Sequence, residues 1–177
     1  MAIRDHMSNF KFFQVVNPQD LDSADITGKD VDTQGFESLT FIINVGMLSE
    51  INSASYVRFV MQHTDASALG LGPSTYADCS ATDILGLAST VKALTSGVVK
   101  TLGEGNSGVS ASLGSTVYTI GYRGTKRYVR MNVDCVGAAC SAVAASDAAI
   151  GIVAMLGYPE SWPIATNVNQ SVDENNV

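Results

Sequence analysis

The sequence predicts an all-β protein, a β-sandwich or barrel of jelly-roll-like form with about six to eight strands, one short helix and flexible terminal arms. Two observations favour this class. Runs rich in β-branched and aromatic residues recur along the 177 residues, with turn-forming residues between them. A single stretch has the apolar spacing of a helix, which argues against strands that alternate with crossover helices.

The first half of the chain contains three strand candidates. Residues 10–16 are rich in Phe, and the Asn-Pro pair that follows ends this run. Residues 17–37 are polar and acidic, which predicts a loop for most of the stretch. Residues 38–46 alternate apolar residues along one face, and Ile42 adds an apolar residue on the other. Residues 55–64 alternate in the same way, as expected for a half-buried strand.

The middle of the chain contains the helix candidate. Residues 65–82 are rich in Gly, Ser, Ala and Asp and predict a loop. Residues 83–94 place apolar side chains at helical spacing, which predicts a short helix. We expect a short strand over 97–102 and a loop over the Gly- and Ser-rich residues 103–115.

Residues 116–123 and 127–135 form the clearest pair of strands. Both runs alternate apolar and polar residues, and a short turn with Gly124 separates them. This pattern predicts a β-hairpin. The small residues of 136–147 predict a loop, and the apolar residues 148–157 predict a final strand.

The chain divides into an N-terminal arm (1–9), one β domain (10–164) and a polar C-terminal tail (165–177). The first ten residues lack the apolar core of a secretion signal. There is no run of about 18 apolar residues that would span a membrane as a helix. We therefore expect synthesis in the cytoplasm of the cell that makes the protein and no membrane association.

The composition favours a protein that assembles. Charged residues make up 15% of the chain and apolar residues 46%, whereas charged residues normally supply about a quarter of a soluble domain. Burial of uncharged surface in an assembly explains this, and a surface of Ser, Thr, Asn and Gly is the alternative. The net charge of −7 argues against nucleic-acid binding, which needs a basic face.

Catalytic and metal-binding patterns are weak. His63 and Asp65 share a strand face, but no nucleophile stands in a Gly-x-Ser-x-Gly turn. We interpret His63 as a strand-end histidine that is hydrogen-bonded to its neighbours. Cys79, Cys135 and Cys140 form an odd set with no histidine nearby, which favours free thiols, with a Cys135–Cys140 bridge as the alternative. We expect no enzymatic activity, no metal and no cofactor.

Two oppositely charged groups are candidate contact residues. The basic group lies on the predicted hairpin, and the acidic group lies in and around the predicted 17–37 loop. The basic residues are Arg123, Lys126, Arg127 and Arg130, and the acidic residues are Asp20, Asp22, Asp30 and Asp32. We expect the acidic group of one copy to meet the basic group of a neighbour, so that Arg127→Glu weakens assembly at low salt. A solvated turn and a solvated acidic loop are the alternatives, and the acidic spacing does not match an EF-hand.

Three segments carry a resemblance to a known class of proteins: Gly-Phe-Glu-Ser-Leu-Thr-Phe at 35–41, Ile-Gly-Tyr-Arg-Gly-Thr-Lys-Arg-Tyr-Val-Arg at 120–130, and Gly-Tyr-Pro-Glu-Ser-Trp-Pro at 157–163. Their order and spacing resemble small virion proteins of tailed bacteriophages, closest to head decoration (cement) proteins. The resemblance implies a non-enzymatic protein on the capsid exterior. Its implied partners are the major capsid protein and further copies of itself, with which it forms a homotrimer. It also implies that the terminal arms reach across capsid joints.

Two other functions remain open. A neck, head-completion or tail-tube protein would form rings or tubes instead of trimers. A carbohydrate-binding β-sandwich on the virion surface would need exposed aromatic residues on one face. Tyr56, Tyr76, Tyr158 and Trp162 are available, although packing in the core or an interface also explains them.

Overall fold

The computed structural model describes residues 9–21, 25–46, 56–65, 75–86, 96–103, 115–136 and 149–160. These residues form ten strands and one 3₁₀ turn. Seven of the strands have five residues or more, in line with the predicted number. In chain order the elements are β1 (Phe10–Asp20), β2 (Val31–Asp32), β3 (Phe36–Val45), β4 (Tyr56–Thr64), β5 (Ala77–Asp78), η1 (Ala81–Asp83), β6 (Ile84–Leu85), β7 (Val98–Leu102), β8 (Thr116–Tyr122), β9 (Tyr128–Val136) and β10 (Ala149–Pro159).

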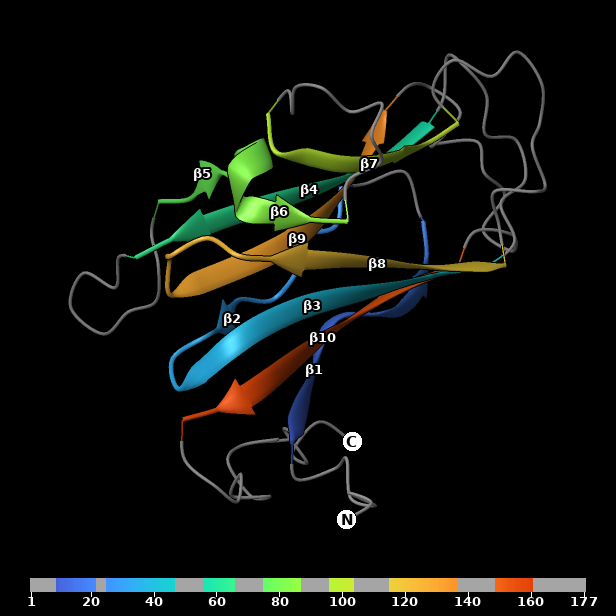
Figure 1. The fold of residues 1–177 in the computed structure, drawn as a ribbon. Coiled ribbons are helices and arrows are strands. Elements are labelled where there is room, and N and C mark those ends of the chain that lie inside the picture. Colours follow the sequence, from blue (N-terminus) through green and yellow to red (C-terminus); the bar gives the residue numbers. More distant parts are fainter. Residues whose placement is uncertain are drawn as a thin grey trace.

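The strands make two antiparallel sheets that pack face to face (Figure 1). Sheet A has the order β1-β10-β3-β8-β6. Sheet B has the order β2-β9-β4-β5, and β7 also pairs with β4. The predicted all-β class is confirmed. Of the two predicted alternatives, a sandwich and a barrel, the structure forms the sandwich.

The strand pairs are nested. Strand β1 pairs with β10, β2 with β9, β3 with β8, and β4 with β7. Two further ladders, between β10 and β3 and between β4 and β9, join these pairs sideways into the sheets. A long antiparallel hairpin wound over itself into two sheets is a jelly roll, so the predicted jelly-roll-like arrangement is also confirmed.

The core lies between the sheets and follows the two-residue period of a strand. Strand β3 directs every second residue inward, and β9 and β10 do the same from opposite sheets. These inward residues are Leu39, Phe41, Ile43 and Val45 from β3, Val129, Met131 and Val133 from β9, and Ile150, Ile152, Ala154 and Leu156 from β10. The apolar alternation predicted from the sequence therefore identifies the core correctly.

The predicted hairpin of 116–123 and 127–135 is wrong. Both strands exist, but β8 pairs with β3 and β6 in sheet A, whereas β9 pairs with β2 and β4 in sheet B. The turn between them crosses from one sheet to the other. A hairpin and a sheet-crossing turn bury the same alternate residues, so the local pattern does not distinguish them.

The predicted helix over 83–94 is wrong where the structure describes it. Ile84 and Leu85 form β6, which pairs with Tyr122 and Gly121 of β8, and Gly86 has a φ of +87°. Helical turns occur only as η1, just before this point, within the described residues. The extended conformation lets Ile84 enter the core while Leu85 faces outward. Residues 87–94 lie outside the described residues.

The first strand is longer than predicted, and the predicted loops contain short strands. Strand β1 continues through Pro18 to Asp20, with two irregularities in its register. It pairs with β10 alone among the described strands, and proline is tolerated at a sheet edge because its missing N–H is not needed there. The predicted loops 17–37 and 65–82 contain β2 and β5. The predicted arm 1–9 (except Asn9) and tail 165–177 lie outside the described residues.

Candidate interaction site

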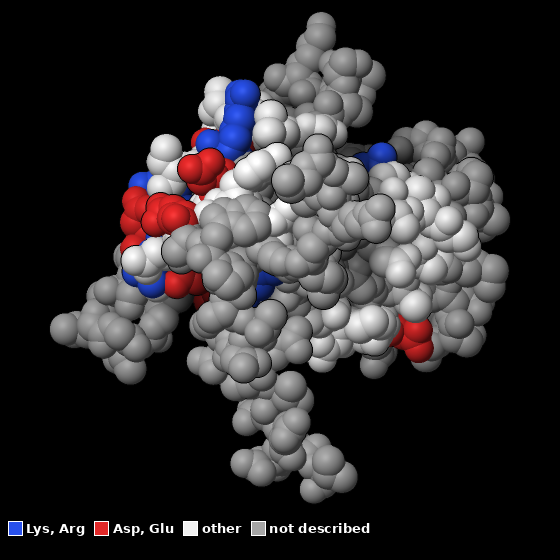
Figure 2. Space-filling model, turned by 60° about the horizontal axis from the view of Figure 1, so that its bottom comes forward, with Lys and Arg blue, Asp and Glu red and all other residues white. Residues whose placement is uncertain are grey.

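The charged end of the sandwich is defined here by Asp32, Asp65, Arg123, Lys126 and Arg127. At this end the β2–β3 turn contacts the sheet crossing, which is the turn that leads from β8 in sheet A to β9 in sheet B. Two hydrogen bonds of 2.9 Å join them, from the Thr33 amide and from the Thr33 hydroxyl to the Arg127 carbonyl. In Figure 2 most of the visible described charged side chains gather on the left of the view.

The predicted basic residues of this end are paired within their own chain. Arg127 holds Asp32 with two parallel bonds, from Nε to Oδ1 at 2.9 Å and from Nη2 to Oδ2 at 2.7 Å. Lys126 forms an ion pair with Asp65. Both pairs are close to half exposed, so each contributes little to stability. The predicted contact between Asp32 and Arg127 of different copies is thus already made inside one chain.

Protonation of the two carboxylates follows these contacts. Burial acts to raise the pKa of Asp32, but bonds from the Arg127 side chain and the Gln34 amide outweigh it and lower that pKa. The bond from Lys126 likewise lowers the pKa of Asp65, helped by the Arg127 amide. Both carboxylates are therefore charged at neutral pH, and the pairs neutralise much of the local charge.

The other predicted basic residues have different roles. Arg123 donates from Nε to the Thr82 carbonyl at 2.5 Å and so joins the crossing to the η1 turn. Arg130 lies on the outer face of sheet B, where it donates to Gln62 at 2.7 and 3.0 Å. Its guanidinium stacks 3.7 Å from the centre of the Tyr76 ring. Arg130 is therefore not part of the charged end.

The predicted acidic residues do not form one group. Asp20 pairs with Ala149, at the end of sheet A opposite to the charged end. Asp30 is exposed and lies near Tyr76. Burial of the Tyr76 hydroxyl is the main reason that its pKa is raised, and the nearby Asp30 carboxylate raises this pKa further. Asp22 lies outside the described residues. Among the described acidic residues, Asp32 pairs with a basic residue of the charged end, whereas Asp30 lies near Tyr76, on whose ring Arg130 stacks.

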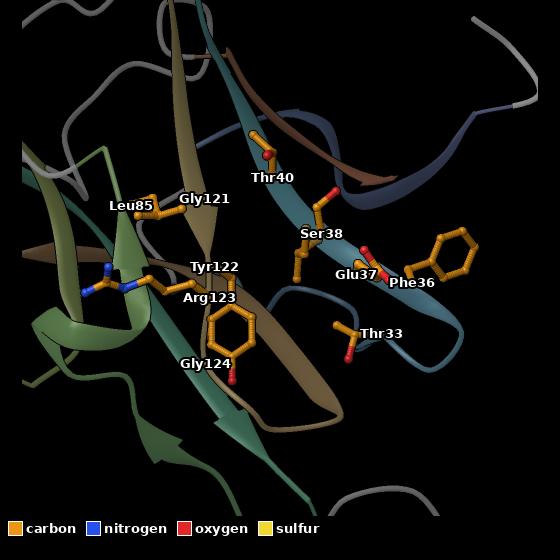
Figure 3. A pocket seen from close by; sticks show the side chains of 11 residues that line it. Thr33, Phe36, Glu37, Ser38, Thr40, Leu85, Gly121, Tyr122, Arg123 and Gly124 are labelled. Atoms are coloured by element: carbon orange, nitrogen blue, oxygen red, sulfur yellow. The ribbon is translucent and has the colours of Figure 1, made fainter. Parts of the chain in front are cut away.

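A hollow of about 300 Å³ opens beside the charged end (Figure 3). Its floor is the outer side of β3, with Ser38 and Thr40, and its wall includes the side chain of Leu85 from β6. Phe36 and Glu37 lie at its rim, at the start of β3 (Figure 3). The lining combines hydroxyl groups, the Glu37 carboxylate, the Arg123 guanidinium and apolar side chains. The one negative and one positive group balance, which suits a polar ligand without net charge.

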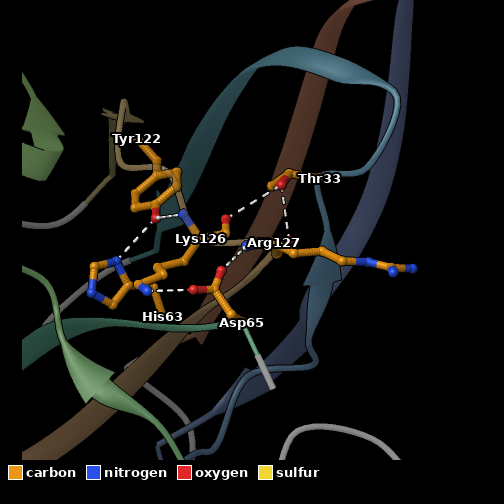
Figure 4. A network of polar contacts seen from close by, with 6 residues as sticks. All are labelled: Thr33, His63, Asp65, Tyr122, Lys126 and Arg127. Carbon is orange, nitrogen blue, oxygen red and sulfur yellow. Dashed lines mark hydrogen bonds and ion pairs between the residues drawn. The ribbon is translucent and has the colours of Figure 1, made fainter. Parts of the chain in front are cut away.

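A hydrogen-bonded tyrosine supports the sheet crossing (Figure 4). The Tyr122 hydroxyl accepts the amide N–H of Lys126 at 3.1 Å and lies 2.9 Å from Nδ1 of His63. The hydroxyl therefore joins the crossing to the end of β4, and the His63 tautomer sets which of the two groups donates. A Cβ on Gly124 would stand 2.3 Å from this hydroxyl, so the turn requires glycine at the position.

His63 is therefore a strand-end histidine with a structural bond. Its partner is Tyr122 of the other sheet and not Asp65, which pairs with Lys126. Sequence reasoning identified His63 but missed Tyr122 as a hydrogen-bonding residue. An inward-facing tyrosine directly before a Gly-containing turn was the available signal.

The expectation of free, partly buried thiols is confirmed for Cys79 and wrong for Cys135. Cys79 is a free, buried thiol, and burial raises its pKa to about 12, with Asp83 and Asp78 adding to the effect. Cys135 is disulfide-bonded, and the other half of its bond lies outside the described residues. The preference for free thiols is thus wrong for Cys135, because sequence spacing alone does not reveal which thiols meet.

Comparisons with protein-family models, with curated proteins and with solved structures gave no match. Within the described ranges, no three His, Cys, Asp or Glu side chains are grouped as metal ligands. Those ranges also contain no helix with the length and hydropathy of a membrane span.

Proposed function

We propose that this chain is a non-enzymatic virion structural protein that binds the outer capsid surface and stabilises the head as a decoration protein. The nested strand pairing carries the proposal, since viral capsid domains are among the main users of the jelly roll. The resemblance of residues 35–41, 120–130 and 157–163 to decoration proteins supports it.

The proposed partners are the major capsid protein and further copies of the chain. The protein is made in the host cytoplasm and acts on the capsid exterior, as a homotrimer in the form that the resemblance implies. The sheet crossing gives such a protein a stiff end, because Tyr122, Thr33 and Arg123 bond three connections to one another. Many modest contacts on one shell add together through multivalency.

Co-sedimentation tests the proposal. Purified protein is mixed with expanded capsid shells of the encoding virus that were assembled without it, and shells already saturated with the protein serve as the control. We expect saturable binding to the bare shells and a higher shell melting temperature. Failure to pellet with bare shells would overturn the decoration function. Rings or tubes of the isolated protein in electron micrographs would then favour a neck, head-completion or tail-tube function.

The hollow beside the charged end favours carbohydrate binding as a second candidate. Lectin domains also use the jelly roll, and the hollow presents Phe36 at its rim next to the hydroxyls of Ser38 and Thr40. Sugars bind through hydroxyl hydrogen bonds and through stacking on an aromatic ring. Binding on a glycan array that is lost in Phe36→Ala and retained in Tyr158→Ala would support this function. If the unmodified protein binds no glycan on the array, the carbohydrate-binding function is refuted.

A further inference from the structure

The hollow beside the charged end exists because β8 leaves sheet A before β3 ends. The ladder between these strands stops at the pair of Leu39 and Tyr122, whereas β3 extends beyond it to Phe36. Beside the first residues of β3, the described neighbour is therefore the sheet crossing, whose Arg123 and Gly124 border the hollow. The departure of β8 leaves an open space of about 300 Å³ there.

The fold fixes both sides of this hollow. Strand β3 pairs with β10 along its other edge, and the Gly35 carbonyl just before β3 accepts the Glu160 amide N–H at 2.9 Å. On the opposite side, the Arg123 amide donates to the Asp83 carbonyl at 2.8 Å, directly before β6 and its Leu85. Figure 3 shows Leu85 and Arg123 facing β3 across the hollow. A hollow with fixed walls loses little freedom when it takes a ligand.

The lining brings hydroxyl groups and apolar side chains close together. Ser38 and Thr40 are half-buried on the outer side of β3, and Leu85 is 50% exposed. In the cross-strand row, Gly121 lies between Thr40 and Leu85 and has no side chain to fill the space between them. A sugar ring carries hydroxyl groups around its edge and C–H groups on its faces, so it can contact both kinds of side chain.

Two charged groups of opposite sign favour a ligand without charge. The Glu37 carboxylate can only accept hydrogen bonds, and the Arg123 guanidinium can only donate them. One guanidinium N–H, that of Nε, already donates to the Thr82 carbonyl, and the group has four others. A sugar hydroxyl both donates and accepts, so it can satisfy either group. An ionised ring is attracted by one of the two groups and repelled by the other.

We propose that this hollow binds a single sugar ring without net charge, at the end of a glycan. Its volume is at the lower limit of small-molecule sites, which are about 300–1,000 Å³, so it has room for one ring and not for a chain. The inference deepens the carbohydrate-binding candidate and rests on it, because it states which part of a glycan the hollow takes. Neutral single rings bind without the rest of the glycan.

Titration of the full, ¹⁵N-labelled chain with single sugars, followed by nuclear magnetic resonance, tests the inference. Glucose, mannose and galactose are the neutral probes, and glucuronate, galacturonate and glucosamine are charged rings of similar size. We expect at least one neutral sugar to shift the amide signals of Thr40 and Gly121 saturably below about 50 mM. A ligand with about 12 non-hydrogen atoms predicts a dissociation constant of the order of 1 mM. The charged rings should bind at least about fivefold more weakly.

Two threonine variants locate the site. Thr40→Val replaces one hydroxyl of the floor by a methyl group and keeps the shape of the side chain, so we expect binding about fivefold weaker or more. Thr101→Val is the matched control, because Thr101 is likewise half-buried in a strand, β7, but belongs to sheet B. Binding by this control should equal that of the unmodified protein. Thermal unfolding of each variant checks that it is folded.

Three results would overturn the inference. In the first, none of the neutral sugars shifts the signals of the hollow. In the second, Thr40→Val binds as tightly as Thr101→Val. In the third, a charged ring binds as tightly as the best neutral sugar. Binding of longer glycans on the array together with the first result would leave carbohydrate binding standing and refute the single ring. Binding to capsid shells does not depend on any of these results.

Discussion

Replacement of Tyr122 by Phe tests the account of the sheet crossing directly. The substitution removes one oxygen and leaves the ring, which is 7% exposed and stacks edge-on against His63 with centroids 5.8 Å apart. The packing is therefore kept, and the change is confined to two hydrogen bonds. One comes from the Lys126 amide at 3.1 Å, and the other joins the hydroxyl to His63 Nδ1 at 2.9 Å.

The magnitude follows from these two partners. A hydrogen bond contributes about 1 kcal/mol net, and a buried donor left without a partner costs about 1–3 kcal/mol. His63 is half-buried and can reach water, and the Lys126 amide is partly buried in the turn, where its hydrogen bond goes to the Tyr122 hydroxyl. We expect Tyr122→Phe to lower the free energy of unfolding by about 2 kcal/mol. In a protein of this size that corresponds to a melting temperature lower by about 4–8 °C.

Urea unfolding followed by circular dichroism measures the effect. Tyr158→Phe is the matched control, because it removes the same atom from a side chain that is 67% exposed. We expect the control to stay within about 0.5 kcal/mol of the unmodified protein. A Tyr122→Phe variant that is as stable as this control would refute the idea that the hydroxyl holds the crossing in place.

Four further predictions concern the same region and the buried thiol. Gly124→Ala should lower stability by about 1–3 kcal/mol in urea unfolding, since its Cβ would meet the Tyr122 hydroxyl, and a neutral result would contradict the close approach. Burial raises the pKa of Tyr122 to about 12, above the ordinary value near 10. Because the folded state holds this proton more tightly, the contribution to stability is full below pH of about 10 and is lost as the pH rises through about 12. Tyr122→Phe should therefore flatten the alkaline stability profile, and an equally steep profile would count against this. Cys79 should react with N-ethylmaleimide only after unfolding, since burial raises its thiol pKa to about 12, and rapid labelling of the native protein would contradict its burial. Arg127→Ala should leave the urea midpoint close to that of the unmodified protein, because its pair with Asp32 is half exposed, and a fall as large as that of Tyr122→Phe would show a stronger role.

The strands and the core were largely predictable from the sequence. Alternation of apolar residues over 38–46, 55–64, 116–123 and 127–135 depends on local geometry alone, because successive side chains of any strand point to opposite faces. The structure buries the expected side of each of these runs. The prediction of a helix over 83–94 was wrong for a related reason. A short apolar run fits both the helical and the strand period, and only the pairing of Ile84 and Leu85 with β8 selects the strand.

The candidate site was predictable only in part. Of the predicted basic group, Arg123, Lys126 and Arg127 lie together at the crossing because they are close in sequence, whereas Arg130 lies apart from them on the outer face of sheet B. The partners of Lys126 and Arg127 within the chain were not predictable, because Asp32 and Asp65 come from connections that the fold brings next to the crossing. The hollow was also not predictable, since the parts of β3, β6 and β8 that line it are far apart in the chain.

By itself, the sequence determined that this chain forms strands, which side of each strand is apolar, and that charge is scarce. The tertiary structure alone decided which strands pair, that β8 and β9 belong to different sheets, and that Asp32 and Asp65 lie beside the basic residues of the crossing. The physical reason is that side-chain alternation is a local property of the backbone. Strand partners and sheet faces are instead set by contacts between residues distant in the chain, and many different pairings bury the same apolar residues.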